Sequence, residues 1–175
     1  MNALERIIPE RALSSGYLFG FLLCIGLLAS AYYFEYALFL EPCPLCIVQR
    51  IATLGIGLGC LFAFFARNTR WPLRLSLLFT LASALFGLWV ANHHVSIQNM
   101  PASEVPECGP GLEYMIETLP THELITTVLR GSGSCADVSW VFLGFTMPEW
   151  TCFAFIGFAL IVLLGLARTW KTDKA

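Results

Sequence analysis

The sequence predicts an all-α membrane protein, a four-helix transmembrane bundle with two loops on its outer side. The first observation is composition: the chain is 57% hydrophobic and only 13% charged, whereas soluble domains carry about 25% charged residues. The second is a set of four long apolar runs, and the third is the position of the basic residues relative to those runs. At 175 residues we expect a single membrane domain, 1–175.

The four expected spans cover residues of about 16–34, 47–66, 71–92 and 150–168. Each is close to the roughly 20 residues that a helix needs to cross about 30 Å of hydrocarbon. Glycines inside these runs do not argue against the interpretation, because membrane helices tolerate glycine.

The first run has a second interpretation as a cleaved signal peptide. Arg6 and Arg11 precede it, and Ala29-Ser30-Ala31 resembles a cleavage site. Secretory apolar regions span only about 7–15 residues, and this run is longer and continues through Phe34. We therefore expect the first span to be retained.

The basic residues predict the orientation of the bundle. By the positive-inside rule, both termini and the short middle loop are expected in the cytoplasm, and loops 35–46 and 93–149 outside. The scattered basic residues form no stripe, so no nucleic-acid partner is indicated. Eight of the ten Lys and Arg residues support this orientation: Arg6, Arg11, Arg67, Arg70, Arg74, Arg168, Lys171 and Lys174.

The seven cysteines fall into two groups. Cys24, Cys60 and Cys152 lie within expected spans, where single cysteines usually behave as small apolar residues. The other four are on the exterior side, in a compartment where thiols tend toward disulfides. They form one close pair and one spread pair: Cys43 and Cys46, and Cys108 and Cys135.

Two non-catalytic interpretations of the exterior cysteines remain open. Zinc sites built from four cysteines usually have two short-spaced pairs, and the long separation of Cys108 from Cys135 disfavours this, so we expect no metal. A structural Cys108–Cys135 disulfide is the stronger alternative, worth roughly 3–4 kcal/mol on the loop-entropy model.

Cys43 and Cys46 fit redox chemistry better than a structural role. A bridge across two residues closes a very short loop and removes little unfolded-state entropy. Pro44 suits the first helical position, which places the pair at a helix N-terminus, where the macrodipole favours a thiolate. Arg50 lies four residues beyond Cys46 on the same helix face. A basic residue near a membrane boundary indicates a functional site, although it can also extend to the headgroups.

These features together resemble the DsbB family, bacterial inner-membrane thiol–quinone oxidoreductases that sustain disulfide bond formation. The resemblance rests on the four spans, the Cys43-Pro44-Leu45-Cys46 motif with Arg50, and the second cysteine pair. The segment Cys135-Ala136-Asp137-Val138-Ser139-Trp140-Val141-Phe142-Leu143-Gly144, followed by Met147-Pro148-Glu149-Trp150, looks like the family's entry into its last span.

The resemblance implies an enzyme, a protein-disulfide:quinone oxidoreductase. Its partner would be a DsbA-like periplasmic thiol oxidase that attacks a Cys108–Cys135 disulfide at Cys108. Cys135 would then attack Cys43, and Cys46 would leave as a thiolate beside the quinone, either ubiquinone or menaquinone. Arg50 and His94 would bind the quinone together with Cys46; His93 matches less well.

The family also implies a multi-pass protein of the bacterial inner membrane, surrounded by lipid, with a periplasmic active site in two periplasmic loops.

Between Cys108 and Cys135, the spacing of apolar residues predicts two short helices, one with Leu112 and Met115 and one after Pro120 that Thr121 could cap. The stretch Gly131-Ser132-Gly133-Ser134 would supply slack before Cys135.

Two other functions stay open. A tetraspan scaffold with structural disulfides would keep its cysteines oxidised whatever the quinone state, and would give Arg50 no role. A quinone reductase like the vitamin K epoxide reductase group also uses four helices and a Cys-x-x-Cys motif, but normally near the end of the bundle rather than at position 43.

Overall fold

Four long helices dominate the computed structural model, which describes residues 10–101, 103–105 and 112–171. Each is long and apolar enough to cross a membrane, which confirms the predicted fold class. Each expected span lies inside one helix, and the helices extend further toward the loops. The four are α2 (Glu10–Leu38), α3 (Pro44–Ala66), α4 (Arg70–Gln98) and α7 (Met147–Lys171).

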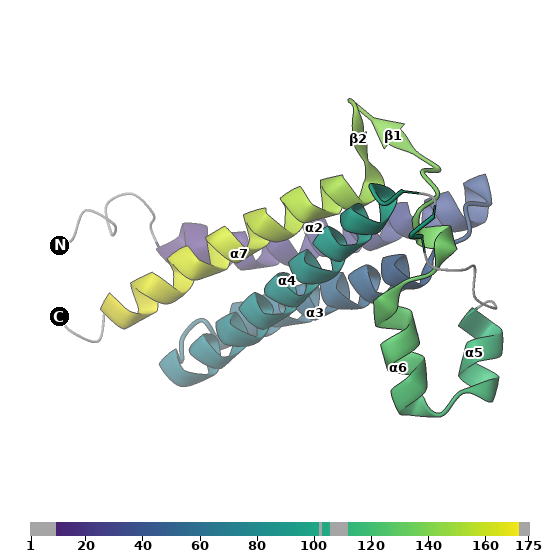
Figure 1. Ribbon diagram of the computed structural model, residues 1–175. Helices are drawn as coiled ribbons and strands as arrows, with labels where there is room; N and C mark the ends of the chain where they lie inside the picture. The colour runs from purple at the N-terminus through teal and green to yellow at the C-terminus, as the bar shows by residue number, and fades with distance from the viewer. Residues whose placement is uncertain (1–9, 102, 106–111, 172–175) are drawn as a thin grey trace.

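The bundle is held together by neighbour-to-neighbour packing (Figure 1). α3 packs against α2 and α4, and α4 packs against α7. Small residues allow the close approach, as in other membrane helices: a Cβ added to Gly87 of α4 would lie 2.6 Å from Cε1 of Phe155 in α7. Cys24 and Cys60 are buried in the central core cluster and Cys152 packs against it, in the manner expected of small apolar residues.

The outer surface of the bundle is apolar, the reverse of a soluble helical protein. Large side chains with more than half of their surface exposed occur on all four long helices. Examples are Phe19, Leu22, Ile51, Phe62, Leu75, Phe79, Leu160 and Ile161. Such a surface is suited to lipid rather than water.

The two ends of the bundle differ in what they carry (Figure 1). The start of α2, the turn between α3 and α4 and the end of α7 lie at one end. The connection from α2 to α3 and the long segment from α4 to α7 lie at the other end, and this loop end carries the polar site described below.

Two short helices lie beside the loop end: α5 (Leu112–Thr118) and α6 (Thr121–Arg130). They correspond to the two short helices that the spacing predicts. The predicted capping role of Thr121 is wrong, because Pro120 occupies the cap position and Thr121 is the first helical residue. After α6 a 3₁₀ turn, η1 (Gly133–Cys135), leads back to the bundle.

A small β-hairpin precedes α7. Strands β1 (Val141–Phe142) and β2 (Phe145–Thr146) pair antiparallel. Leu143 and Gly144 connect them with φ angles of 53° and 86°, as a two-residue hairpin turn with positive φ at both positions requires. The hairpin folds back onto α7, where the Trp150 indole N–H donates to the Phe142 carbonyl over 3.1 Å.

Candidate functional site

The cysteine pair lies at the N-terminus of α3. Cys43 is the N-cap residue and Pro44 the first helical residue, as the sequence predicts. The Cys43 Sγ accepts the Cys46 backbone N–H over 3.3 Å, and the two Sγ atoms are 2.7 Å apart. Both cysteines are free thiols here, so close together that a disulfide between them requires only a small movement.

Cys135 lies against this pair, although it is 89 positions beyond Cys46 in the sequence. Its side chain is fully buried in one cluster with Cys43 and Leu45. The neighbouring Cys43 thiol and the backbone N–H groups of Ser132 and Leu45 stabilise the Cys135 thiolate. These contacts lower the pKa of Cys135 to about 6, while the neighbouring Cys135 raises the pKa of Cys43.

Gly131 permits this approach. Its φ of +82° is in the region that favours glycine. A Cβ there would lie 2.6 Å from Cδ1 of Ile97 and 3.2 Å from Cδ1 of Leu45. Gly131 and Gly133 are both buried, whereas Ser134 is exposed, so the two glycines of the segment expected to supply slack pack beside the cysteines.

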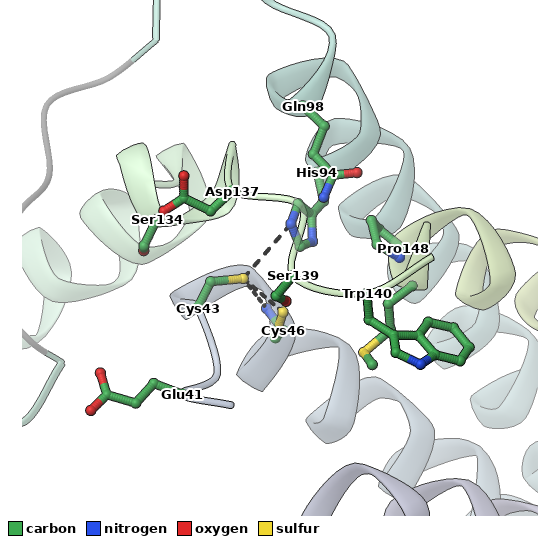
Figure 2. Close-up of a pocket in the computed structure, with 11 residues that line it drawn as sticks. Glu41, Cys43, Cys46, His94, Gln98, Ser134, Asp137, Ser139, Trp140 and Pro148 are labelled. Atoms are coloured by element: carbon green, nitrogen blue, oxygen red, sulfur yellow. Dashed lines mark hydrogen bonds between the residues drawn. The ribbon is translucent and has the colours of Figure 1, made fainter. Parts of the chain in front are cut away.

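His94 projects from α4 to the same point (Figure 2). It is only 3% exposed. Its Nε2 is 3.8 Å from the Cys43 Sγ and 3.1 Å from the Cys135 carbonyl oxygen. On the opposite side of the ring, Nδ1 is 3.1 Å from Nε2 of Gln49.

The neighbouring His93 contacts the same loop at an earlier position. Its Nε2 is 3.1 Å from the Arg130 carbonyl at the end of α6, and its ring stacks on Trp89 with centroids 6.2 Å apart. Two consecutive histidines of α4 therefore hold the loop on both sides of residues 131–134.

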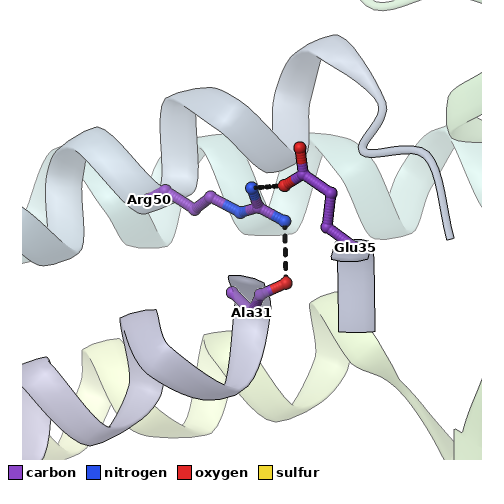
Figure 3. A network of polar contacts seen from close by, with 3 residues as sticks. All are labelled: Ala31, Glu35 and Arg50. Atoms are coloured by element: carbon purple, nitrogen blue, oxygen red, sulfur yellow. Dashed lines mark hydrogen bonds and ion pairs between the residues drawn. The ribbon is translucent and has the colours of Figure 1, made fainter. Parts of the chain in front are cut away.

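The Arg50 side chain contacts α2. Its guanidinium forms an ion pair with Glu35 and donates to the Ala31 carbonyl over 3.1 Å (Figure 3). Its Cζ lies 5.1 Å from the ring centroid of Tyr32. All three partners belong to α2, so Arg50 joins α3 to α2 one turn beyond Cys46.

The cysteine pair opens into a pocket at the loop end of the bundle. Cys43, Cys46 and His94 line it. Trp140, Met147 and Pro148 supply apolar surface, and the other lining residues are polar: Glu41, Gln98, Ser134, Asp137 and Ser139. Trp140 also contacts Phe34 of α2, with ring centroids 5.6 Å apart. The pocket therefore combines thiols with a lining that is apolar in one part and polar in another.

The same cluster contains the ligand types of a soft metal ion. The donor atoms of Cys43, Cys46 and His94 all lie within 4.8 Å of one another. The His94 nitrogen that faces the thiols is already bonded to the Cys135 carbonyl, and it would have to give up that bond and its proton before it could coordinate a metal.

The structure brings together four of the six site residues that the sequence predicts. Arg50 is near but engaged elsewhere, and Cys108 lies outside the described residues. Sequence reasoning missed the partners: Glu35, Gln49 and Thr151. The available signal was polarity, since each interrupts or borders an apolar run. The four residues that meet are Cys43, Cys46, His94 and Cys135.

Comparison with known proteins matches this arrangement to one family. Residues 14–165 match the family model described as disulfide bond formation protein DsbB. The disulfide bond formation protein B of Nitrosococcus oceani is 43% identical over 150 residues, covering 86% of this chain and 89% of the relative. That of Marinobacter nauticus is 44% identical over 156 residues, 88% and 91% of the two chains. That of Xylella fastidiosa is 38% identical over 175 residues, 99% and 96%.

Proposed function

Because the chain belongs to the DsbB family of disulfide bond formation proteins, we propose that it reoxidises a DsbA-like periplasmic thiol oxidase and passes the electrons to a membrane quinone. The observation that supports this most strongly is the contact of the Cys135 sulfur with the Cys43–Cys46 pair. A disulfide that served only to hold a loop together would have no need of a second thiol pair beside it.

The electrons travel by two thiol–disulfide exchanges. The reduced oxidase attacks the Sγ of Cys108, the Cys108–Cys135 bond breaks, and Cys135 leaves as a thiolate. Cys135 then attacks the Sγ of Cys43, the Cys43–Cys46 bond breaks, and Cys46 leaves as a thiolate. The backbone N–H groups of Ser132 and Leu45 beside the Cys135 sulfur suit this sequence, because they stabilise the thiolate, which is both the better leaving group and the attacking species.

Further steps complete the catalytic cycle, one releasing the oxidised partner and one reoxidising the Cys43–Cys46 pair. The second thiol of the oxidase displaces Cys108, which completes the oxidised partner, and Cys108 then returns to Cys135 and releases Cys43. The thiols of Cys43 and Cys46 become a disulfide again, and their two electrons and two protons pass to the quinone. A quinone is suited to this because a DsbA-like oxidase is already strongly oxidising, at about −120 mV.

We infer that the quinone ring binds beside Cys46, against the apolar wall of Trp140, Met147 and Pro148. Arg50, one turn further along α3, would stabilise the Cys46 thiolate and negative charge on the quinone oxygen. His94 lines the same pocket and is a further candidate for the ring, although both of its nitrogens already have protein partners.

The site would face the periplasm of a bacterium from its inner membrane. Basic residues flank the other end of the bundle, at the turn between α3 and α4 and at the end of α7, and the positive-inside rule places that end in the cytoplasm. Neither alternative, the scaffold or the vitamin K epoxide reductase-like enzyme, is favoured, since the family match spans nearly the whole chain.

The test is quinone reduction by the purified protein in lipid nanodiscs, with a reduced DsbA-like oxidase as electron donor. We expect one quinone reduced for each oxidase disulfide formed, with either ubiquinone or menaquinone analogues as acceptor. Cys46→Ala should abolish the reaction, whereas Cys152→Ala, a matched loss of a thiol in the core, should keep it. A wild-type rate no higher than that of Cys46→Ala would refute the proposal.

A further inference from the structure

The hydrogen bonds around His94 have a definite direction. The Cys135 carbonyl has no proton to give, so the Nε2 atom 3.1 Å from it must carry the hydrogen and donate. Nδ1 of the neutral ring is then an acceptor. It receives a hydrogen bond from the Gln49 side-chain amide, whose Nε2 lies 3.1 Å away.

The side-chain amide of Gln49 extends this chain of hydrogen bonds to a third helix. With its NH₂ group facing His94, its Oε1 is an acceptor for the Thr151 hydroxyl at 2.6 Å, the shorter of the two contacts of that hydroxyl; the other is to the Pro148 carbonyl at 2.8 Å. Thr151 lies in the first turns of α7, Gln49 in α3 and His94 in α4. Gln49 is 6% and His94 3% exposed, so water does not compete effectively for these bonds.

We propose that the Thr151–Gln49–His94 chain is a positioning device that holds the backbone of Cys135, and with it the attacking sulfur, against Cys43. The inference deepens the proposed function by assigning these three residues to the exchange between the two cysteine pairs. Thiol exchange depends on close alignment of three sulfur atoms, and a displacement of about 1 Å is enough to slow such a step strongly.

The alternative role for His94, contact with the quinone, makes a different prediction. A quinone ligand acts on the quinone KM. A group that positions Cys135 acts on the exchange between Cys135 and Cys43, which takes place without quinone. In the described part of the chain, His94 is what links Thr151 and Gln49 to Cys135, so their effects identify which of the two steps His94 serves.

The decisive measurement needs neither quinone nor a protein partner. In a Cys46→Ser/Cys108→Ser background, Cys43 and Cys135 are the remaining exterior thiols, and their disulfide can be equilibrated with a glutathione redox buffer and quantified by alkylation and mass spectrometry. Thr151→Val, which keeps the shape but removes the hydroxyl, should lower the equilibrium constant of this disulfide about fivefold, the effect of one buried hydrogen bond.

Two further variants make the result specific. Thr151→Ser keeps the hydroxyl and should restore the equilibrium constant to within about twofold of the background protein. Gln49→Leu breaks the same chain from α3 and should reproduce the Thr151→Val shift. If both Thr151→Val and Gln49→Leu match the background protein, the chain does not position Cys135 and the inference is wrong.

Turnover with a reduced DsbA-like oxidase provides the second readout. In otherwise wild-type protein, Thr151→Val should lower kcat while leaving the quinone KM unchanged, and Thr151→Ser should recover kcat. A raised quinone KM with an unchanged Cys43–Cys135 equilibrium would assign the chain to the quinone instead and overturn the inference. If the wild-type protein transferred no electrons to quinone, the proposed function would fail, while the disulfide equilibrium would still decide the positioning role.

Discussion

Arg50 of α3 is paired with Glu35 of α2, one turn beyond the cysteine that we place beside the quinone. The carboxylate balances the guanidinium charge and occupies one of its nitrogens, while the Ala31 carbonyl occupies another. In the structure the arginine is therefore not a free cation. Any negative charge that forms on Cys46 or on the quinone has to compete with Glu35 for it.

This competition predicts a gain of function. Glu35→Gln keeps a hydrogen-bond acceptor for Arg50 but removes the opposing charge, and it should lower the quinone KM by about two- to fivefold, the range expected for a partly exposed ion pair. Steady-state quinone reduction with the oxidase in excess measures it. Glu117→Gln, an equal loss of charge on exposed α5, is the control. A higher KM in Glu35→Gln would show that the carboxylate assists quinone binding.

Arg50 itself should be needed at the quinone end of the pathway. Arg50→Ala removes a charge-assisted contact worth roughly 1.5–3 kcal/mol, so the quinone KM should rise about tenfold or more. Arg50→Lys should rescue only part of this, because lysine keeps the charge but loses the planar fork. The same titration of quinone concentration is the measurement. If Arg50→Ala left the quinone KM and the turnover unchanged, the role of Arg50 would be limited to joining α3 to α2.

Loss of either cysteine of the second pair should separate electron transfer from loop stabilisation. Cys108→Ser and Cys135→Ser should abolish oxidation of the DsbA-like partner, because no sulfur remains to link the partner to Cys43. The Cys43–Cys46 pair should still be oxidised by quinone, which alkylation of the quinone-treated protein would reveal. Partner oxidation at the wild-type rate in both variants would make the second pair structural.

The sequence predicts the features of this fold that depend on local chemistry. Length and apolar character define the four long helices, and Pro44 after Cys43 predicts where α3 begins. The prediction fails where a boundary depends on more than hydropathy. The apolar run ends at Phe34, which would place Glu35 in a loop, whereas α2 continues to Leu38 and places Glu35 opposite Arg50.

Which residues of the site contact one another depends on how each helix is oriented about its own axis. The spacing of residues in a single sequence does not reveal that orientation. Gln49 and Thr151 are 102 positions apart and meet only because α3 and α7 both present polar groups beneath His94. The hairpin at Leu143 and Gly144 also escapes prediction, because its two-residue strands are too short for an alternating pattern.

The thiolate character of Cys135 predicts an unusual pH dependence. Its pKa of about 6 lies below the usual cysteine value of about 8.5, so the thiolate should form as the pH rises through about 6. Because the buried sulfur is shielded from alkylating reagents, the ultraviolet thiolate absorbance of the reduced protein, less that of its Cys135→Ser counterpart, is the measurement and should give a midpoint near that pH. The Cys43 thiol is the main cause, so Cys43→Ala should move the midpoint upward and Cys43→Ser, which keeps a donor, should move it less. A midpoint near the usual value in all three proteins would contradict this origin.

Gly131 should be the most sensitive glycine near the site. Gly131→Ala places a Cβ 2.6 Å from Cδ1 of Ile97 in a backbone conformation with φ of +82°, and crowding of this kind costs about 1–3 kcal/mol. The loop should shift and carry Cys135 away from Cys43, lowering turnover with the DsbA-like oxidase by about tenfold or more.

Two variants distinguish crowding from backbone strain at this glycine. Gly144→Ala has nearly the same φ, +86°, but nothing within 4 Å of the new Cβ, so it carries the strain without the collision and should retain most of the turnover. Adding Ile97→Val to Gly131→Ala removes the Cδ1 atom that the new methyl group would meet, and should restore part of the lost rate. If Gly144→Ala were as slow as Gly131→Ala, or if Ile97→Val gave no recovery, close packing of residue 131 against α4 would not be what holds Cys135 in place.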